Sequence, residues 1–162
     1  MTKNALPSNI HSTIRILKIA TCPTCSGKAT LTYHIGCNSN SEINFQIIDN
    51  TGGGFFSKEW ISLSTIQAAL SSSPKPITSI ALSKLFQGKS VNTPAFLLAV
   101  LNSERLLKPL EGKNSCYECT NPQVFITEIN RLISSKIDLK SDLALPLKNT
   151  IALSKKTSVS IT

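Results

Sequence analysis

The chain has 162 residues, of which 41% are hydrophobic and 6% aromatic, a composition that suits one compact domain with an aliphatic core and is short for two. Its formal net charge of +8 favours polyanionic partners such as nucleic acid, although charge says nothing about the fold. The longest apolar run, residues 95–101, is far shorter than the roughly 18 residues of a membrane-spanning helix, and residues 1–9 carry no apolar stretch of signal-peptide type, so we expect a cytoplasmic protein without a membrane partner.

The first 50 residues predict a small antiparallel sheet. Residues 13–19 fit a short strand, and apolar side chains alternate with a period of two along residues 28–35 and 43–47. The first strand leads into the sequence Cys-Pro-Thr-Cys, which a glycine follows two residues later. A glycine at this point suits a backbone that curls around a metal ion.

Four of the five cysteines form two Cys-x-x-Cys pairs, Cys22 with Cys25 and Cys116 with Cys119. This spacing lets a tight turn present both sulfurs to one tetrahedral metal ion. We therefore predict one structural Zn²⁺ that is held by all four thiolates and clamps the two segments together. Such a site leaves no open coordination position, so the metal would not be catalytic.

Three other interpretations of the cysteines remain open. A local Cys3His site could combine the first pair with His34 and Cys37, although we favour a half-buried histidine and an inert thiol at a strand end for these two residues. A disulfide framework would need an oxidising compartment. A redox role for Cys22 and Cys25 leaves the distant second pair unexplained.

A glycine-rich stretch, residues 49–54, precedes Phe55, Phe56 and Trp60. It lacks the Lys-Ser/Thr ending of a phosphate-binding P-loop, so we predict a hairpin or loop that needs positive φ angles. The aromatic side chains could stack on nucleotide bases, or they could anchor the loop to the core.

Two short helices follow. Ser64 and Gln67 match a capping box, with Ser64 as the N-cap of a helix over residues 64–70. Thr78 or Ser79 caps the second helix, which a glycine ends at position 88.

The third predicted helix has Pro94 in its first turn and continues until Pro109. It is apolar all round over residues 95–101, so it must be covered on nearly all sides. We expect the first two helices and the sheet to cover it. Residues 106–113 then fit the start of a hairpin.

The three helices and this hairpin resemble the general architecture of a helix-turn-helix or winged-helix unit over residues 64–113. That resemblance implies DNA binding, but an apolar third helix lacks the polar face that a recognition helix needs for base edges.

After the second cysteine pair, Pro122 begins a last helix. Its apolar stripe is predicted to consist of Val124, Phe125, Ile129, Leu132 and Ile133. Residues 138–162 show no steady periodicity and are predicted to form a flexible or partner-ordered tail. The fold class is therefore α+β: one zinc-clamped domain over residues 1–137, with a helix-turn-helix-like insertion at 64–113, followed by the tail.

No histidine–carboxylate metal motif, nucleophile elbow or close carboxylate pair is present, so we predict a protein without enzymatic activity. The predicted function is zinc-stabilised binding of nucleic acid, with DNA favoured over RNA. The side chains predicted to contact it are basic or polar: Lys75, Lys84, Lys89, Asn92, Thr93, Arg105, Lys108 and Lys113, together with Arg15, Lys18 and Lys28. The alternatives are a zinc-clamped interaction subunit of a larger nucleoprotein assembly, such as a transcription, transposition or CRISPR-type complex, and a thiol redox protein.

Overall fold

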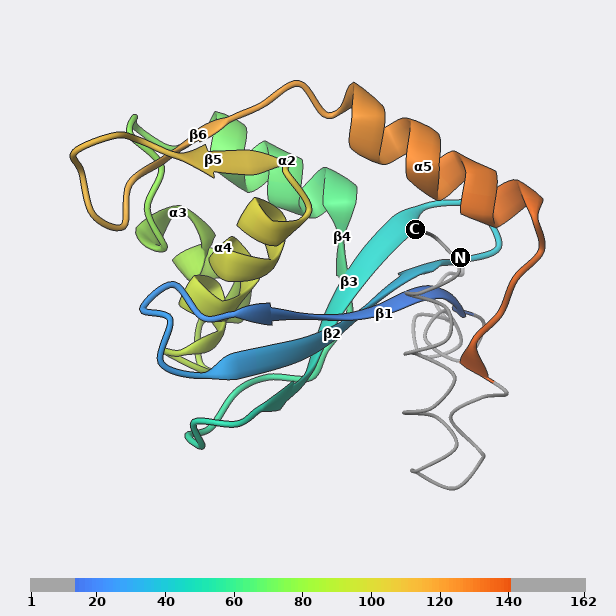
Figure 1. Ribbon diagram of the computed structural model, residues 1–162, viewed down its shortest axis with the longest axis horizontal. Coiled ribbons are helices and arrows are strands. Elements are labelled where there is room, and N and C mark those ends of the chain that lie inside the picture. Colours follow the sequence, from blue (N-terminus) through green and yellow to red (C-terminus); the bar gives the residue numbers. More distant parts are fainter. Residues whose placement is uncertain (1–13, 141–162) are drawn as a thin grey trace, which may run out of the picture.

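The computed structural model describes residues 14–140 and shows a mixed α+β fold in which helices pack against an antiparallel sheet (Figure 1). The main sheet has four strands in the order β1-β2-β3-β4, and each neighbouring pair is antiparallel. Its strands are β1 (Arg15–Pro23), β2 (Thr30–Cys37), β3 (Ile43–Asn50) and β4 (Ile61–Ser62). The predicted small antiparallel sheet is confirmed, and its first three strands continue a few residues beyond their predicted ends.

Within residues 14–140, four α-helices and a second sheet accompany the main sheet. The helices are α2 (Leu63–Ser71), α3 (Ile80–Ser83), which the 3-10 helix η1 (Lys84–Phe86) continues, α4 (Thr93–Ser103) and α5 (Gln123–Ser134). The second sheet is an antiparallel hairpin of β5 (Leu107–Pro109) and β6 (Tyr117–Cys119). No helix of this part of the chain is long and apolar enough to cross a membrane.

The period-two alternation along β2 and β3 turns one face of the main sheet toward the core. Leu31, Tyr33 and Ile35 of β2 are buried, and Phe45 of β3 pairs with Ile35 in register. Since successive side chains of a strand point to opposite faces, His34 lies on the other face of the sheet.

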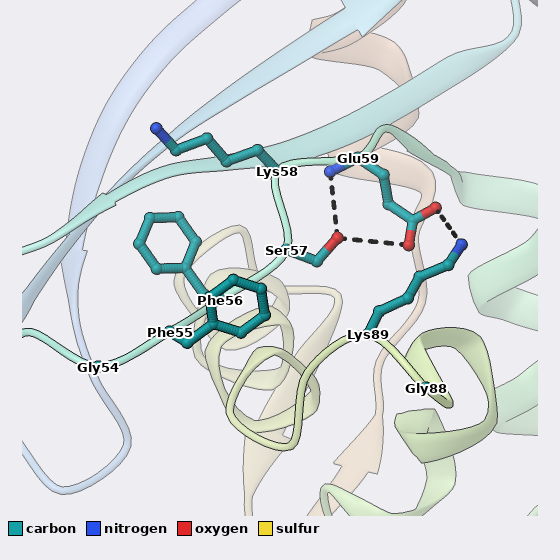
Figure 2. Close-up of a pocket in the computed structure, with 8 residues that line it drawn as sticks. All are labelled: Gly54, Phe55, Phe56, Ser57, Lys58, Glu59, Gly88 and Lys89. Atoms are coloured by element: carbon teal, nitrogen blue, oxygen red, sulfur yellow. Dashed lines mark hydrogen bonds and ion pairs between the residues drawn. The ribbon is translucent and has the colours of Figure 1, made fainter.

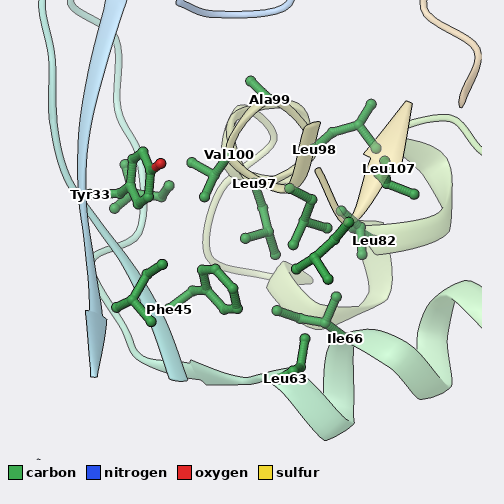
Figure 3. Packing of buried hydrophobic residues seen from close by; sticks show 14 of the residues in the cluster. Tyr33, Phe45, Leu63, Ile66, Leu82, Leu97, Leu98, Ala99, Val100 and Leu107 are labelled. Carbon is green, nitrogen blue, oxygen red and sulfur yellow. The ribbon is translucent and has the colours of Figure 1, made fainter. Parts of the chain in front are cut away.

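Helix α4 is the centre of the core. Leu97, Leu98, Val100 and Leu101 are at most 2% exposed, and the helix contacts β1, β3, α3, η1 and β5. In Figure 3, Val100 extends from α4 toward Tyr33 of the sheet, whereas Leu98 lies on the side of the hairpin. The expectation that this apolar helix is covered on nearly all sides is confirmed.

The end of α4 differs from the prediction. The helix stops at Ser103, well before Pro109, because the backbone N–H of Leu106 donates to the carbonyl of Leu101 (2.9 Å) and that of Arg105 donates to Asn102 (3.0 Å). These two bonds form a Schellman motif, with Arg105 in the left-handed region at φ +65°. The chain then leaves the helix axis and continues into β5.

The start of α2 also differs. Its N-cap is Ser62, not Ser64, because the hydroxyl oxygen of Ser62 accepts from the backbone N–H of Thr65 at 3.1 Å. Ser64 lies inside the helix and donates to the carboxylate of Glu42. Tertiary pairing of β4 with β3 brings the extended chain up to Ser62, so the helix begins directly after that strand.

Helix α5 begins after Pro122 as predicted. Phe125 and Ile129 are buried, and the ring of Phe125 stacks on Phe45 of β3 at 5.8 Å. The predicted apolar stripe is wrong at Val124, which is 80% exposed. One residue is about a 100° rotation around a helix, so Val124 faces solvent while Phe125 faces the sheet.

The helix-turn-helix or winged-helix character of residues 64–113 is not confirmed. Helix α3 has only one turn before η1, and α4, which would be the recognition helix, is buried. A hairpin does follow α4, but it covers the core helix instead of extending from a DNA-binding face.

The first residues of the predicted tail are ordered against β1. The carboxylate of Asp138 accepts from the backbone N–H of Ile16 (3.1 Å), and the N–H of Leu139 donates to the carbonyl of Ile16 (2.8 Å). Residues 141–162 lie outside the described residues, so the tail prediction is not tested there.

The central position of α4 predicts a large effect of core truncation. Leu97→Ala should lower the free energy of unfolding by about 2–5 kcal/mol, since it removes buried methyl groups and leaves a cavity. Val124→Ala, at an exposed apolar position, should change it by no more than about 0.5 kcal/mol. Urea unfolding followed by circular dichroism measures both. Equal effects of the two substitutions would contradict the central role of α4.

Candidate nucleic-acid interface

The two cysteine pairs have different backbone conformations. The first is followed by the predicted turn, in which the N–H of Gly27 donates to the carbonyl of Thr24 (2.8 Å). The second lies in and beside strand β6, so the prediction of a tight turn at Cys116 and Cys119 is wrong. Cys116 directly precedes the strand and Cys119 is its last residue, so the extended backbone between them does not bring the two thiols together as the turn of a knuckle does.

The fold nevertheless places the pairs on neighbouring segments. Tyr117, which lies between the cysteines of the second pair, donates its hydroxyl to the sulfur of Cys25 at 3.4 Å. All five cysteines are free thiols. Within residues 14–140, no group of three or more His, Cys, Asp or Glu side chains is arranged to hold a metal ion, so the four thiols as placed do not fit zinc, and the predicted Zn²⁺ stays a prediction.

The alternative local Cys3His site is excluded by strand register. Cys22 pairs with Leu31 at the beginning of β2, whereas Cys37 pairs with Arg15 at its end. Six residues along a strand span roughly 20 Å. Cys37 is buried and accepts from the guanidinium of Arg15, and His34 lies on the opposite face, so these two residues have the structural roles that the sequence also allowed.

The environment of Cys22 weighs against a redox role. Burial raises the pKa of its thiol to about 11, and the Glu104 carboxylate adds to this shift. The reactive form of a cysteine is the thiolate, which a raised pKa disfavours.

Three of the residues predicted to contact nucleic acid serve the fold instead. The guanidinium of Arg15 donates to the backbone carbonyls of Ile133 and Ile137 and holds α5 on the sheet. The side chain of Asn92 donates to the carbonyl of Phe55 at 2.7 Å. Thr93 is 1% exposed, so the prediction that it contacts nucleic acid is wrong.

Three predicted lysines form ion pairs. Lys18 pairs with Glu104 (3.0 Å), which also accepts from the Tyr33 hydroxyl, Lys89 pairs with Glu59 (3.0 Å), and Lys108 pairs with Glu118 (3.3 Å). The remaining five predicted cations are exposed and make no ion pair within residues 14–140: Lys28, Lys75, Lys84, Arg105 and Lys113.

Three loops meet at the N-terminus of α4, at the left-hand end of the main sheet in Figure 1. We call residues 24–29, 51–59 and 87–92 the loop end. Cys25 of the first loop donates to the carbonyl of Ala95 in α4 (3.6 Å), and the N–H of Thr30 donates to the hydroxyl of Thr51 in the second loop (2.9 Å). Asn92 joins the second loop to the third through its bond to Phe55.

An open groove of about 720 Å³ lies at the loop end, between residues 54–59 and residues 88–89 (Figure 2). Phe55 on its wall is 71% exposed, whereas the ring of Phe56 packs edge-on against Phe96 at 6.2 Å. The amine of Lys58 lies 5.8 Å from the centre of the Phe56 ring. A second hollow of about 500 Å³ adjoins the groove through its shared residues Gly88 and Lys89.

The groove resolves the two roles that the sequence left open for its aromatic residues. Phe56 anchors the loop to α4, and Phe55 remains available at the surface. Lys58 was missed as a candidate contact, although its position two residues after an aromatic pair and a glycine run was a usable signal.

Comparison of the chain with protein-family models, with curated proteins and with solved structures gives no match.

His34 is a buried titratable group that lies outside the loop end. Its ring centre lies 6.4 Å from that of Trp60, it pairs in register with Gln46, and its Nδ1 has no hydrogen-bond partner. Burial lowers the pKa of His34 below its ordinary value, more than its hydrogen bond with Gln46 raises it.

This environment predicts acid sensitivity. Because the folded protein holds His34 neutral, the unfolded chain binds the proton more readily, and the free energy of unfolding should fall as pH drops below about 6.5. His34→Asn should remove this component, so the pH slopes should differ by at most about 1.4 kcal/mol per pH unit. Urea unfolding between about pH 5 and 7 measures both slopes. Parallel slopes would show that His34 does not titrate with folding.

Proposed function

We propose that the protein binds nucleic acid without catalytic activity and that the loop end contacts the phosphates. The observation that carries this proposal is the convergence of three separate loops, with lysines on or beside each, at the N-terminus of α4. The lysines are Lys28 in the first loop, Lys58 in the second, Lys89 in the third and Lys84 in the preceding η1.

The charge balance at the loop end supports phosphate contacts. Lys28, Lys58 and Lys84 are exposed and make no ion pair within the described chain. The carboxylate of Glu59 is engaged by Lys89, and the N-terminus of α4 adds partial positive charge. Flexible ammonium groups bind phosphates without reading sequence.

The other predicted cations lie on different elements. Arg105 follows the far end of α4, Lys113 lies in the β5–β6 loop and Lys75 precedes α3. We propose that these residues, with the ion-paired Lys18 and Lys108, add to the positive field and steer association, while direct contacts are made at the loop end.

Salt dependence tests this proposal. Replacement of Lys28, Lys58 and Lys84 together by alanine should weaken binding of an oligonucleotide and reduce the log–log salt slope by about two for a single strand or three for a duplex. Fluorescence anisotropy at several salt concentrations measures the affinities.

The matched control replaces Lys75, Lys113 and Lys136 in the same way. These lysines lie away from the loop end, and their replacement removes the same amount of positive charge. The control should lower the affinity modestly and leave the slope close to that of the wild type. Equal slopes for the two triple variants would contradict the assignment of phosphate contacts to the loop end.

A protein-interaction subunit would need an apolar surface for docking, and the most apolar helix described, α4, is buried and offers none. It becomes the better hypothesis if the wild-type protein binds neither DNA nor RNA at low salt.

We further propose that the two cysteine pairs bind one Zn²⁺. The contact between Tyr117 and Cys25 supports this proposal, because it joins segments that are 92 residues apart. Zinc binding requires the second pair to leave its strand conformation and to turn both thiols toward the first pair.

Cys119→Ser provides the test, because this side chain is exposed. Without a metal, a surface substitution should change the free energy of unfolding by no more than about 0.5 kcal/mol. If Cys119 binds zinc, the variant should lose the metal and with it much of a binding energy on the order of 10–16 kcal/mol. Elemental analysis and thermal unfolding give the answer, with Cys37→Ser, at the opposite end of the sheet, expected to retain the metal. Folded wild-type protein without zinc would end this proposal.

A further inference from the structure

We infer that the loop end binds single-stranded nucleic acid and that Phe55 stacks on an unpaired base. This inference rests on the proposed function and names its substrate class. The occupant is argued from the lining of the groove: the exposed ring of Phe55 and the amine of Lys58, which makes no ion pair within the described residues, lie on the same groove of a strongly basic chain.

The backbone holds Phe55 in place while its ring stays exposed. The carbonyl of Phe55 accepts from the side chains of Asn92 (2.7 Å) and Ser90 (3.5 Å). Two residues later, the N–H of Ser57 donates to the hydroxyl of Thr93 (2.8 Å). The backbone from Phe55 to Ser57 is therefore tied to residues 90–93, at the start of α4.

Gly54 completes this arrangement. Its φ of +88° is a conformation that side-chain-bearing residues rarely adopt, and it turns the chain directly before Phe55. An aromatic ring on a fixed backbone loses little conformational freedom when a base stacks on it, because only two side-chain torsions remain to be ordered.

A single-strand site needs a ring on which a base stacks and cations that bind the phosphates, and different residues of the groove supply the two. Phe56 is engaged by Phe96 and anchors the loop, so only Phe55 offers a free ring face. Figure 2 shows the amine of Lys58 and the ion pair of Lys89 with Glu59 around the same groove. A strand whose base stacks on Phe55 would have its phosphates within the field of these lysines.

The same structure offers a duplex no comparable site. Bases in a duplex are stacked on one another, so a surface ring cannot reach their faces without unpairing them. Among the longer helices described, α4 is buried, α2 carries no basic residue, and Arg131 of α5 is paired with Glu128. None of them presents a free cationic face to the major groove.

The experiment compares a short single-stranded oligonucleotide with the duplex of the same sequence. The wild type should bind the single strand more tightly at equal salt. Phe55→Ala should weaken single-strand binding by about five- to 150-fold, the range measured for loss of one base–aromatic stack, and should change duplex binding less than twofold. Phe55→Trp should retain the affinity, since tryptophan also offers a ring face.

Val91→Ala is the matched control, because Val91 is a 93% exposed apolar residue of the same loop end. It should leave single-strand binding unchanged. Both substitutions are at the surface, and circular dichroism verifies that the variants are folded.

The outcomes distinguish the two proposals. If the Lys28/Lys58/Lys84 variant binds more weakly but Phe55→Ala binds like the wild type, the proposed function holds and single-strand stacking is wrong. Tighter binding of the duplex overturns the inference in the same way. If the wild type binds neither oligonucleotide at low salt, the proposed function itself fails, and a groove that binds a peptide or a second copy of the chain becomes the hypothesis to test.

Discussion

The burial of α4 is the constraint on which the rest of the structure depends. A helix that is apolar on all sides cannot lie on a surface, so the main sheet, α3, η1 and the β5–β6 hairpin must surround it. Each fully buried leucine or valine contributes about 1.5–3 kcal/mol relative to exposure. Only the two ends of the helix reach polar surroundings, and both ends are where the chain changes direction.

At its N-terminal end, α4 holds the loop that carries Phe55. The side chain of Asn92 donates to the carbonyl of Phe55, and the hydroxyl of Thr93 accepts from the N–H of Ser57, which fixes the backbone from Phe55 to Ser57. Two residues predicted to contact nucleic acid therefore position the loop, and the exposed ring of Phe55 and the neighbouring Lys58 are the groups available to a ligand. A rigid loop reduces the entropy that binding must overcome.

The two cysteine pairs show that backbone conformation decides whether a Cys-x-x-Cys sequence can hold a metal ion. Spacing alone makes both pairs suitable for a metal ion, but β6 pairs with β5 through its backbone and becomes extended. The extended backbone separates the thiols of Cys116 and Cys119, and Tyr117 between them reaches Cys25. The contact between segments so far apart in sequence is the part of the zinc hypothesis that the fold supports.

The sequence by itself determined the features that arise from neighbours along the chain: the period-two strands of the sheet, the turn after Cys22, the helix that begins after Pro122 and the need to bury residues 95–101. Only the tertiary structure decided which loops meet. The exposure of Phe55 beside the burial of Phe56, the internal use of Thr93 and the Schellman end at Arg105 depend on partners that periodicity does not identify. Local sequence patterns indicate the conformation that each stretch of backbone prefers. Whether a side chain is available to bind a ligand depends on whether distant residues already contact its donor, acceptor or ring face.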